Sequence, residues 1–326
     1  MINIKKLIVK IEDSVEAHRL ERTGEYFRFL ASENKEIDPY GCADAANIYY
    51  TLGKFPDKTS EGSWISVLRS MQDQKDGLFH ESTHHAYHTT AHCIAALELF
   101  NAGPSFKLKA LSALKELKAL REFLDKLEWK TSPWGQSHRG AGIFAALVLA
   151  GEVNTEWEKC YFEWLWNESD PKTGLFRKGC IEPLQLGKIS SIFPHLAGTF
   201  HYLFNMEYRH IKLRYPEKLV DTCLDIIKND PFPLGRAVNF SEVDWVYCLN
   251  RSLKQSGKRS GEGKKELFKF ASGYIEYLDS LDISGFDDIH STFGAVCALA
   301  ELQSIFPGEI ITEIPLRLVL DRRPFI

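Results

Sequence analysis

Residues 137–151 have the sequence SHRGAGIFAALVLAG, in which a polar opening is followed by small residues and then by an apolar run with helical spacing. A helix that is apolar on all sides belongs in the interior of a protein. Inner helices that pack closely also need small residues, and Gly140, Gly142 and Ala145 are among those that provide them here. We therefore expect this segment to form an inner helix of a large helical core.

Five other segments follow the same plan, so the chain contains an internal repeat. The six segments begin near Tyr40, His84, Ser137, Pro194, Ser241 and Asp288. Their starts are separated by roughly 44, 53, 57, 47 and 47 residues. This spacing fits one helical hairpin per repeat, with loops of variable length.

Charged, amphipathic segments alternate with these six. Residues 107–127, for example, have the sequence KLKALSALKELKALREFLDKL, whose charged face belongs on the outside. The expected outer helices span residues 14–31, 63–72, 106–127, 155–166, 216–228 and 264–281. Strict alternation of six inner and six outer helices predicts an all-α (α/α)6 toroid of six helical hairpins. We expect a single domain over residues 1–326, in which residues 309–326 form an extended C-terminal tail.

Composition and charge limit the classes of function. The chain has 44% hydrophobic and 26% charged residues and a formal net charge of -4, as is usual for a soluble globular protein. Lysine and arginine are spread along the chain, so nucleic acid is not an expected partner. The sequence shows no signal peptide and no apolar stretch long enough for a bilayer. We expect a cytoplasmic protein that does not bind membranes, and the sequence leaves its oligomeric state open.

Two loops share a phrase that resembles a known repeat. Residues 72–79 (QDQKDGLF) and 168–176 (ESDPKTGLF) each follow a segment with a tryptophan near its start. The first phrase resembles the Gln-rich, Asp-Gly-aromatic loop of the terpenoid cyclase and protein prenyltransferase toroids. Class II terpene cyclases use an Asp-x-Asp-Asp acid motif, of which Phe286-Asp287-Asp288 offers only the second half. The wider plan of six hairpins resembles the (α/α)6 superfamily of glycosidases, polysaccharide lyases and sugar epimerases.

Polar residues concentrate where the inner helices begin. If these helices run parallel around a ring, their amino termini open on one face. Helix amino termini carry partial positive charge and free N–H groups, so such a face suits an anionic or hydroxyl-rich ligand. The residues at the six openings are Asp38, Tyr40 and Asp44; His84, His85, His88 and His92; Trp134, Gln136, His138 and Arg139; His195 and His201; Asn239, Glu242 and Asp244; and Asp287, Asp288 and His290.

The candidate catalytic residues are carboxylates and histidines at these openings. Such groups can divide acid and base roles when their environments move their pKa values apart. We predict that Asp44, His88, His138 and Asp244 act as catalytic acids and bases. For Asp44 a second interpretation stays open, because a buried carboxylate among alanines can also tie two inner helices together by hydrogen bonds.

A second group of residues at the openings is predicted to bind the substrate. Its members are Tyr40, His84, His85, Trp134, Arg139, His195, His201 and Asp288. Sugars stack on aromatic faces such as that of Trp134, and Arg139 can hold a carboxylate through two parallel hydrogen bonds. A uronic acid is therefore a candidate substrate. Alternatively, Arg139 forms a structural salt bridge, and Asp288 caps its helix.

No cofactor and no metal are expected. His84, His88 and His92 lie four residues apart and share one face of the predicted helix, but three ligands on one straight helix are too spread for a single tetrahedral ion. A His-Glu-x-x-His pattern is also missing. The seven cysteines contain no Cys-x-x-Cys pair and are expected to be reduced core residues.

Together these features predict a carbohydrate-active enzyme, that is, a glycoside hydrolase, lyase or epimerase that uses Asp and His on a small molecule or an oligosaccharide. Two alternatives stay open: a terpenoid-cyclase-like toroid that acts on an isoprenoid, and a non-catalytic toroid that binds a glycan or a protein. A carboxyl and a histidine within reach of one point favour an enzyme. A pocket lined mainly by aromatic side chains favours a cyclase.

Overall fold

The chain is predominantly helical, which confirms the helical fold class predicted from the sequence. The structure is a computed structural model and describes residues 1–181, 191–230 and 232–326. Two short strands, β1 (Ile2–Asn3) and β2 (Ile310–Ile311), pair in parallel. No helix in the described ranges is long and apolar enough to cross a membrane.

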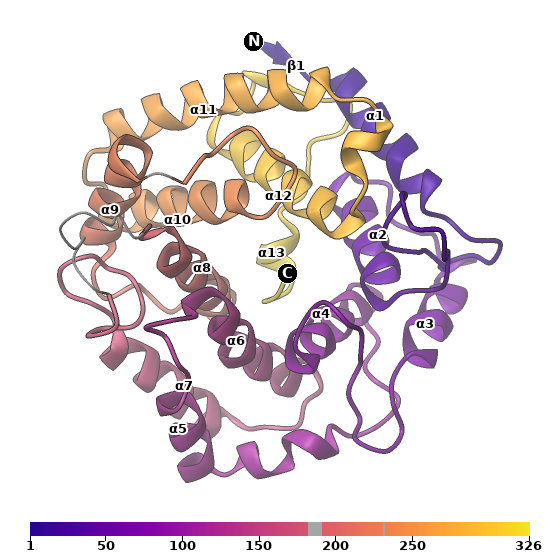
Figure 1. Cartoon of the computed structure of the whole chain (residues 1–326), viewed down its shortest axis with the longest axis horizontal. Coiled ribbons are helices and arrows are strands. Elements are labelled where there is room, and N and C mark those ends of the chain that lie inside the picture. Colours follow the sequence, from indigo (N-terminus) through magenta and orange to yellow (C-terminus); the bar gives the residue numbers. More distant parts are fainter. Residues whose placement is uncertain (182–190, 231) are drawn as a thin grey trace.

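Six helices that carry the sequence repeat surround the centre of the molecule (Figure 1). They are α2 (Pro39–Thr51), α4 (Ala86–Leu99), α6 (Pro133–Leu149), α8 (Phe193–Tyr208), α10 (Ser241–Ser256) and α12 (Ile289–Ile305). Each contacts the next one along the chain, and α12 contacts α2, so the contacts form a closed cycle. We call these six the inner helices.

More exposed helices lie outside this cycle (Figure 1). They are α1 (Lys5–Ala17), α3 (Glu61–Ser70), α5 (Leu117–Asp125), α7 (Thr155–Glu168), α9 (Pro216–Asn229) and α11 (Ser260–Ser280). Two 3-10 helices, η1 (Lys109–Lys115) and η2 (Ile283–Phe286), and the short α13 (Val319–Arg322) complete the helical elements of the described residues. Inner and outer helices therefore alternate along the chain, as the composition of the segments indicates.

The first outer helix lies earlier than predicted, so the expected helix over residues 14–31 is wrong. α1 begins at Lys5 because its buried Leu7, Ile11 and Val15 recur every four residues and form one apolar stripe. The chain then leaves the helix, and an isolated antiparallel bridge joins Arg19 to Tyr26.

The expected helix over residues 106–127 is divided in two. η1 and α5 are separated at Glu116, whose backbone is extended. The amide of Leu108 donates to the Glu152 carboxylate at 3.0 Å, and Lys115 pairs with the same carboxylate at 2.5 Å. Because these bonds tie η1 to the segment after α6, tertiary contacts outweigh the local helix propensity.

The two loops that share a phrase in the sequence also share a structure. In each, an isolated antiparallel bridge closes the loop. The amide of Phe79 donates to the Thr90 hydroxyl of α4 at 2.9 Å, and the amide of Phe176 donates to the Thr199 hydroxyl of α8 at 3.0 Å. The repeat thus extends to equivalent hydrogen bonds, which fix each loop on the inner helix that follows it.

Residues 309–326, predicted as a tail, run into the middle of the inner helices, where α13 and the last residues lie (Figure 1). The amide of Arg317 donates to the carbonyl of Thr51 at the end of α2. Further along, Asn205 of α8 donates to the carbonyl of Pro324 at 2.7 Å. The ring of Phe325 is fully buried, with its centroid 4.8 Å from that of His88. The segment therefore fills the centre from the carboxyl-terminal side of the inner helices.

Small residues allow the inner helices to approach one another closely. A Cβ atom built on Gly142 of α6 would lie only 2.8 Å from the carbonyl oxygen of Tyr87 on α4. Backbone atoms cannot move aside as a flexible side chain can, so only glycine fits at this position of the described helix pair. By contrast, a Cβ on Gly273 of the outer helix α11 would meet nothing within 4 Å.

These two glycines make a matched test of the close packing. We expect Gly142→Ala to lower the free energy of unfolding by about 1–3 kcal/mol, because the new methyl group overpacks the contact between α4 and α6. Gly273→Ala should instead raise it by about 0.5–1 kcal/mol through helix propensity alone. Urea unfolding followed by circular dichroism measures both, and equal effects of the same sign would contradict the packing described here.

Candidate functional site

Polar side chains of the inner helices meet near the amino-terminal ends of these helices. His88 comes from α4, His138 from α6 and His201 from α8. The ring centroid of His138 lies 4.4 Å from that of His88 and 4.6 Å from that of His201. One ring nitrogen from each residue lies within 4.8 Å of the other two. The structure thus brings together three histidines from three separate openings, and we call them the histidine cluster.

Hydrogen bonds orient two of these three imidazoles. Nδ1 of His88 bonds to the hydroxyl of Tyr40. Nδ1 of His201 lies 2.9 Å from Oγ of Ser137, whose hydroxyl donates to the carbonyl of Trp134 at 2.5 Å. Since the Ser137 proton is already used, His201 donates Nδ1–H to Ser137, and its Nε2 carries a free lone pair.

Burial keeps the histidine cluster neutral. It lowers the pKa of His88 and of His138 well below the usual value, and charge on the neighbouring imidazoles would lower both further. Burial likewise lowers the pKa of His201 to about 3. At neutral pH the cluster is therefore a set of uncharged imidazoles, which is the form that binds a metal cation.

Asp44 joins three inner helices close to this cluster. Its fully buried carboxylate on α2 lies 2.7 Å from Nε2 of His92 on α4 and 3.0 Å from Nδ1 of His290 on α12. Burial alone would raise the pKa of Asp44, but the electrostatic attraction and the hydrogen bonds of the His290 and His92 N–H groups outweigh it and hold this pKa far below the usual range. Burial lowers the pKa of His92 to about 4 despite the carboxylate. At neutral pH an Asp44 anion therefore accepts N–H bonds from two neutral imidazoles.

This geometry matches the hydrogen-bonding interpretation of Asp44, and its catalytic role stays a prediction. The positive charges of Arg28 and Arg323 act on the carboxylate from other elements, since Asp44 raises the pKa of both guanidinium groups. We call Asp44, His92 and His290 the aspartate triad.

A carboxylate that was not predicted from the sequence lies beside the histidine cluster. One oxygen of Glu81, in the loop before α4, is 3.5 Å from Nδ1 of His84, and the other is 3.7 Å from Nη1 of Arg28. Burial would raise the pKa of Glu81, but hydrogen bonds from His84 and Thr83 lower it to about 2. Glu81 is therefore ionised next to a histidine.

His84 reaches both the histidine cluster and the solvent. Its side chain is 17% exposed, and its ring centroid lies 4.8 Å from that of His88. The hydroxyl of Thr83 donates to Glu81 at 2.6 Å, so its oxygen accepts Nδ1–H of His84 at 2.8 Å. Nε2 of His84 is therefore the nitrogen with a free lone pair, and the Glu81 anion would stabilise the imidazolium that forms when it takes up a proton.

Trp134 and Arg139, both predicted to bind substrate, are partly exposed at the start of α6. The guanidinium of Arg139 lies 5.5 Å from the ring of Phe123, and its Nη1 donates to Gln136 at 3.2 Å. Its Nε has no partner among the described residues, and no carboxylate in that part of the chain forms an ion pair with it. The predicted salt bridge of Arg139 is therefore not seen in the part of the chain that the structure describes.

Three other predicted residues have structural surroundings. Nδ1 of His85 accepts the amide of Tyr87 at 3.2 Å and so caps α4. Asp288 caps α12 and accepts Nε of Arg28 at 2.9 Å. His195 of α8 is nearly buried, and its Nδ1 has no partner among the described residues.

The structure does not bring Asp244 to the histidine cluster. Asp244 is fully buried on α10, and both of its carboxylate oxygens have no hydrogen-bond partner in the described ranges. Burial raises its pKa well above the usual value, and the ionisable group that acts on it is Glu242. Glu242 is also buried; one oxygen accepts the amide of Gly235 at 3.0 Å, and burial raises its pKa to about 7.

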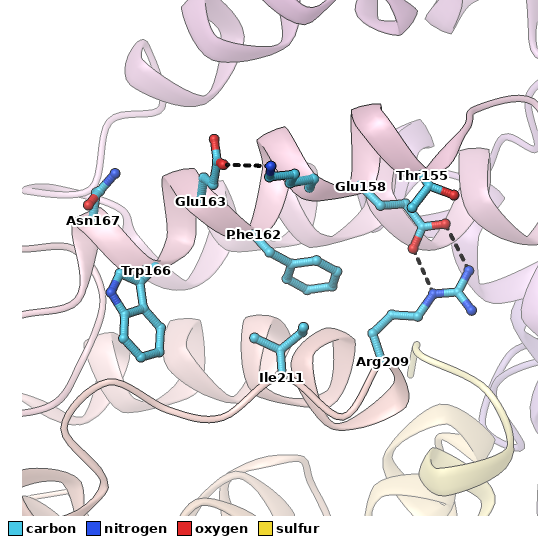
Figure 2. Close-up of a pocket in the computed structure, with 9 residues that line it drawn as sticks. Thr155, Glu158, Phe162, Glu163, Trp166, Asn167, Arg209 and Ile211 are labelled. Carbon is cyan, nitrogen blue, oxygen red and sulfur yellow. Dashed lines mark hydrogen bonds and ion pairs between the residues drawn. The ribbon is translucent and has the colours of Figure 1, made fainter.

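A separate cavity of about 610 Å³ lies outside the inner helices, between α7 and the segment after α8 (Figure 2). Phe162, Trp166 and Ile211 give it an apolar lining. Its charged residues pair with each other, as Arg209 does with Glu158 at 2.7 Å. This cavity offers contact area but no free ionised group, so the amino-terminal ends of the inner helices remain the better candidate site.

Comparisons with known proteins identify no relative. No protein-family model matches the chain, and neither the curated proteins nor the solved structures contain a significant match. The site has to be interpreted from its own chemistry.

Several residues of the site were missed by sequence analysis. Glu81 stands three residues before His84 in a polar loop, a spacing that could have marked the pair. Ser137 was not predicted to belong to the site, although it lies next to His138 in the sequence. Arg28 and Phe325 gave no signal, because they reach the site from segments far away in the sequence.

The neutral buried histidines predict a loss of stability in mild acid. Unfolded histidines take up a proton near pH 6.5, whereas His92 in the folded chain stays neutral down to about pH 4. The free energy of unfolding should therefore fall as the pH drops from 6.5 to 4, by up to about 1.4 kcal/mol per pH unit for each such histidine. Urea unfolding at several pH values measures this slope.

A variant pair assigns part of the slope to His92. His92→Gln keeps an N–H donor for Asp44 but removes the titrating group, so its slope should be smaller by up to one proton. His80→Gln, at an exposed position, serves as the control and should keep the slope of the unaltered chain. An unchanged slope in His92→Gln would contradict a neutral buried His92.

Glu242 predicts the opposite pH dependence. Its pKa rises from 4.5 in the unfolded chain to about 7 on folding, so stability is lost as the pH rises through this window. Glu242→Gln should therefore be more stable than the unaltered chain at pH 8, by up to about 3 kcal/mol, and nearly equal to it at pH 4.5. Glu276→Gln on the exposed face of α11 is the control. A pH-independent difference would rule out the buried, protonated carboxyl.

Proposed function

We propose that the chain is an (α/α)6 toroid of the six-hairpin type and an enzyme that abstracts a proton from a uronic-acid-containing sugar, as a lyase or an epimerase. The observation that carries this proposal is the Glu81–His84 pair, an ionised carboxylate 3.5 Å from a partly exposed histidine beside three neutral imidazoles. Four imidazoles and a carboxylate thus lie together where the inner helices begin.

The proposed base is Nε2 of His84. It would remove the proton on the sugar carbon that bears the carboxylate group, while Glu81 stabilises the resulting imidazolium. In a lyase the neighbouring C4–O bond then breaks, the electron pair of the removed C5–H bond forms the C4–C5 double bond, and the leaving oxygen takes a proton. In an epimerase a proton returns to the opposite face of the same carbon.

The charge states at this site favour proton abstraction over glycoside hydrolysis. Hydrolysis usually needs one carboxylic acid with a raised pKa and a second ionised carboxylate. Glu81 and Asp288 both have a lowered pKa, because hydrogen bonds from His84 and Thr83 to Glu81, and from Arg28 to Asp288, outweigh the effect of burial. Neither can serve as the protonated acid at neutral pH, whereas His84 can serve as a base.

Arg139 and Trp134 suit a uronic acid. Arg139 is partly exposed and forms no ion pair with a described carboxylate, so its guanidinium can neutralise the sugar carboxylate and favour loss of the adjacent proton. The partly exposed ring of Trp134 can stack on the sugar.

The two alternatives fit this site less well. A terpenoid cyclase needs a protonated acid, but the remaining half of that motif, Asp288, is bonded to Arg28 with a lowered pKa. A binding module has no need of an ionised carboxylate held beside a partly exposed histidine, as Glu81 is beside His84.

The proposal can be tested by deuterium exchange on a panel of uronate oligosaccharides. In D2O the protein should place deuterium at C5 of an epimerised product, or should release an unsaturated product that absorbs ultraviolet light. His84→Gln should lower the rate by at least about 100-fold, because it removes the general base. Mass spectrometry and absorbance measure the two outcomes.

Two controls make the result specific. His80→Gln removes an exposed histidine on the preceding loop and should keep the full rate. Arg139→Lys keeps the charge but loses the planar fork, and should raise KM more than it lowers kcat. Hydrolysis without exchange at C5, or full activity of His84→Gln, would overturn the proposed reaction.

A further inference from the structure

Three groups of histidine and carboxylate side chains lie close enough together in the described residues to bind one ion. They are the histidine cluster His88, His138 and His201; the aspartate triad Asp44, His92 and His290; and the surface group Asp73, Asp76 and His80. We propose that the histidine cluster binds one divalent transition-metal ion, and that Zn²⁺ suits it best. This metal site goes beyond the proposed function, which uses His84 and Glu81 and requires no ion. Its occupation can be measured without any substrate.

The ligand set supports this choice. Neutral imidazoles are good ligands for zinc, at Zn–N distances of about 2.0–2.1 Å. Around a tetrahedral ion such nitrogens lie roughly 3.3 Å apart, and here one nitrogen of each histidine lies within 4.8 Å of the others. Small side-chain rotations close this difference. Because His88, His138 and His201 come from three different helices, they surround a point, unlike ligands along one straight helix.

Supporting hydrogen bonds resemble those of metal-binding histidines. A histidine that binds a metal through one nitrogen usually holds its other nitrogen in a hydrogen bond, which fixes the tautomer and the ring orientation. Ser137 does this for Nδ1 of His201, and Tyr40 bonds to Nδ1 of His88. The Nε2 atoms of both rings are then left for the ion.

The other two groups already have partners that explain them. In the aspartate triad, the carboxylate of Asp44 bonds directly to both histidines, so an ion would have to replace bonds that exist. In the surface group, Asp73 and Asp76 accept backbone amides of their own turn, at 2.6 and 2.8 Å. In the histidine cluster no hydrogen bond joins the three rings to one another within the described residues.

Phe325 packs against His88 at 4.8 Å between ring centroids, and the partly exposed His84 lies at the same distance from His88. Structural zinc sites are closed by four protein ligands. With three histidines as ligands, a water molecule would complete the coordination of a bound ion, as in catalytic zinc sites.

The test is metal binding by the purified full chain after removal of metals with a chelator. Isothermal titration with Zn²⁺ should give one ion per chain, and Co²⁺ should give the visible absorption bands of a four- or five-coordinate site. His138→Gln and His201→Gln should each weaken binding by more than about 100-fold, and Ser137→Ala by about 10- to 100-fold.

Variants of the other groups serve as controls, and circular dichroism checks that every variant is folded. His92→Gln in the aspartate triad and His80→Gln in the surface group should bind the ion like the unaltered chain. Absence of binding by the folded chain would overturn the metal site. So would binding that His80→Gln abolishes and His201→Gln leaves intact. Because no substrate is used, failure here is distinct from failure of the proposed reaction.

Discussion

The buried carboxylate of Asp44 is the constraint on which the rest of the site depends. An ionised carboxylate in a core is costly unless it is fully hydrogen-bonded, and the donors of Asp44 come from His92 on α4 and from His290 on α12. His290 lies 246 residues away in the sequence, so this bond closes the cycle of inner helices between the last helix and the first. Such buried polar contacts do not necessarily add net stability, but they specify one arrangement, because a shift of either helix would leave a charge without partners.

The bond between Asp44 and His92 also determines the position of the histidine cluster along the inner helices. Tyr40 and Asp44 are four residues apart on α2, and His88 and His92 are four residues apart on α4, so each pair shares one helix face. The bond between Asp44 and His92 therefore has a counterpart one turn earlier, between Tyr40 and His88. The bond between Asp44 and His92 fixes the register of α2 and α4. The bond between Tyr40 and His88 then orients the ring of His88 towards α6 and α8. The C-terminal segment supports this arrangement, because the buried ring of Phe325 packs against His88.

The repeat of inner helices could be predicted from the sequence, whereas contacts between segments far apart in the chain could not. The six inner helices were predicted because apolar residues on all sides and small residues such as Gly142 leave a helix no stable place except the interior. The start of α1 was missed although Leu7, Ile11 and Val15 recur with helical spacing. The break at Glu116 could not be predicted, because bonds to Glu152 outweigh the local helix propensity there. In the site, residues at helix starts could be predicted to share one end. Which of these residues contact one another could not be predicted. Glu81, Arg28 and Phe325 reach the site from loops and from the C-terminal segment, and no pattern in the sequence determines their distance from His84 or His88.

The charge balance explains how a base and a cation could work side by side. A divalent ion on the histidine cluster would lie close to His84, whose ring is 4.8 Å from that of His88. The Glu81 anion lies 3.5 Å from Nδ1 of His84 and would offset part of the positive charge of the ion there. Hydrogen bonds from His84 and Thr83 keep Glu81 ionised despite its burial, and Nη1 of Arg28 lies 3.7 Å from the same carboxylate. The loop before α4 thus supplies a negative charge next to the proposed base, which is why we assign the base to His84 and the ligands to the more deeply buried imidazoles.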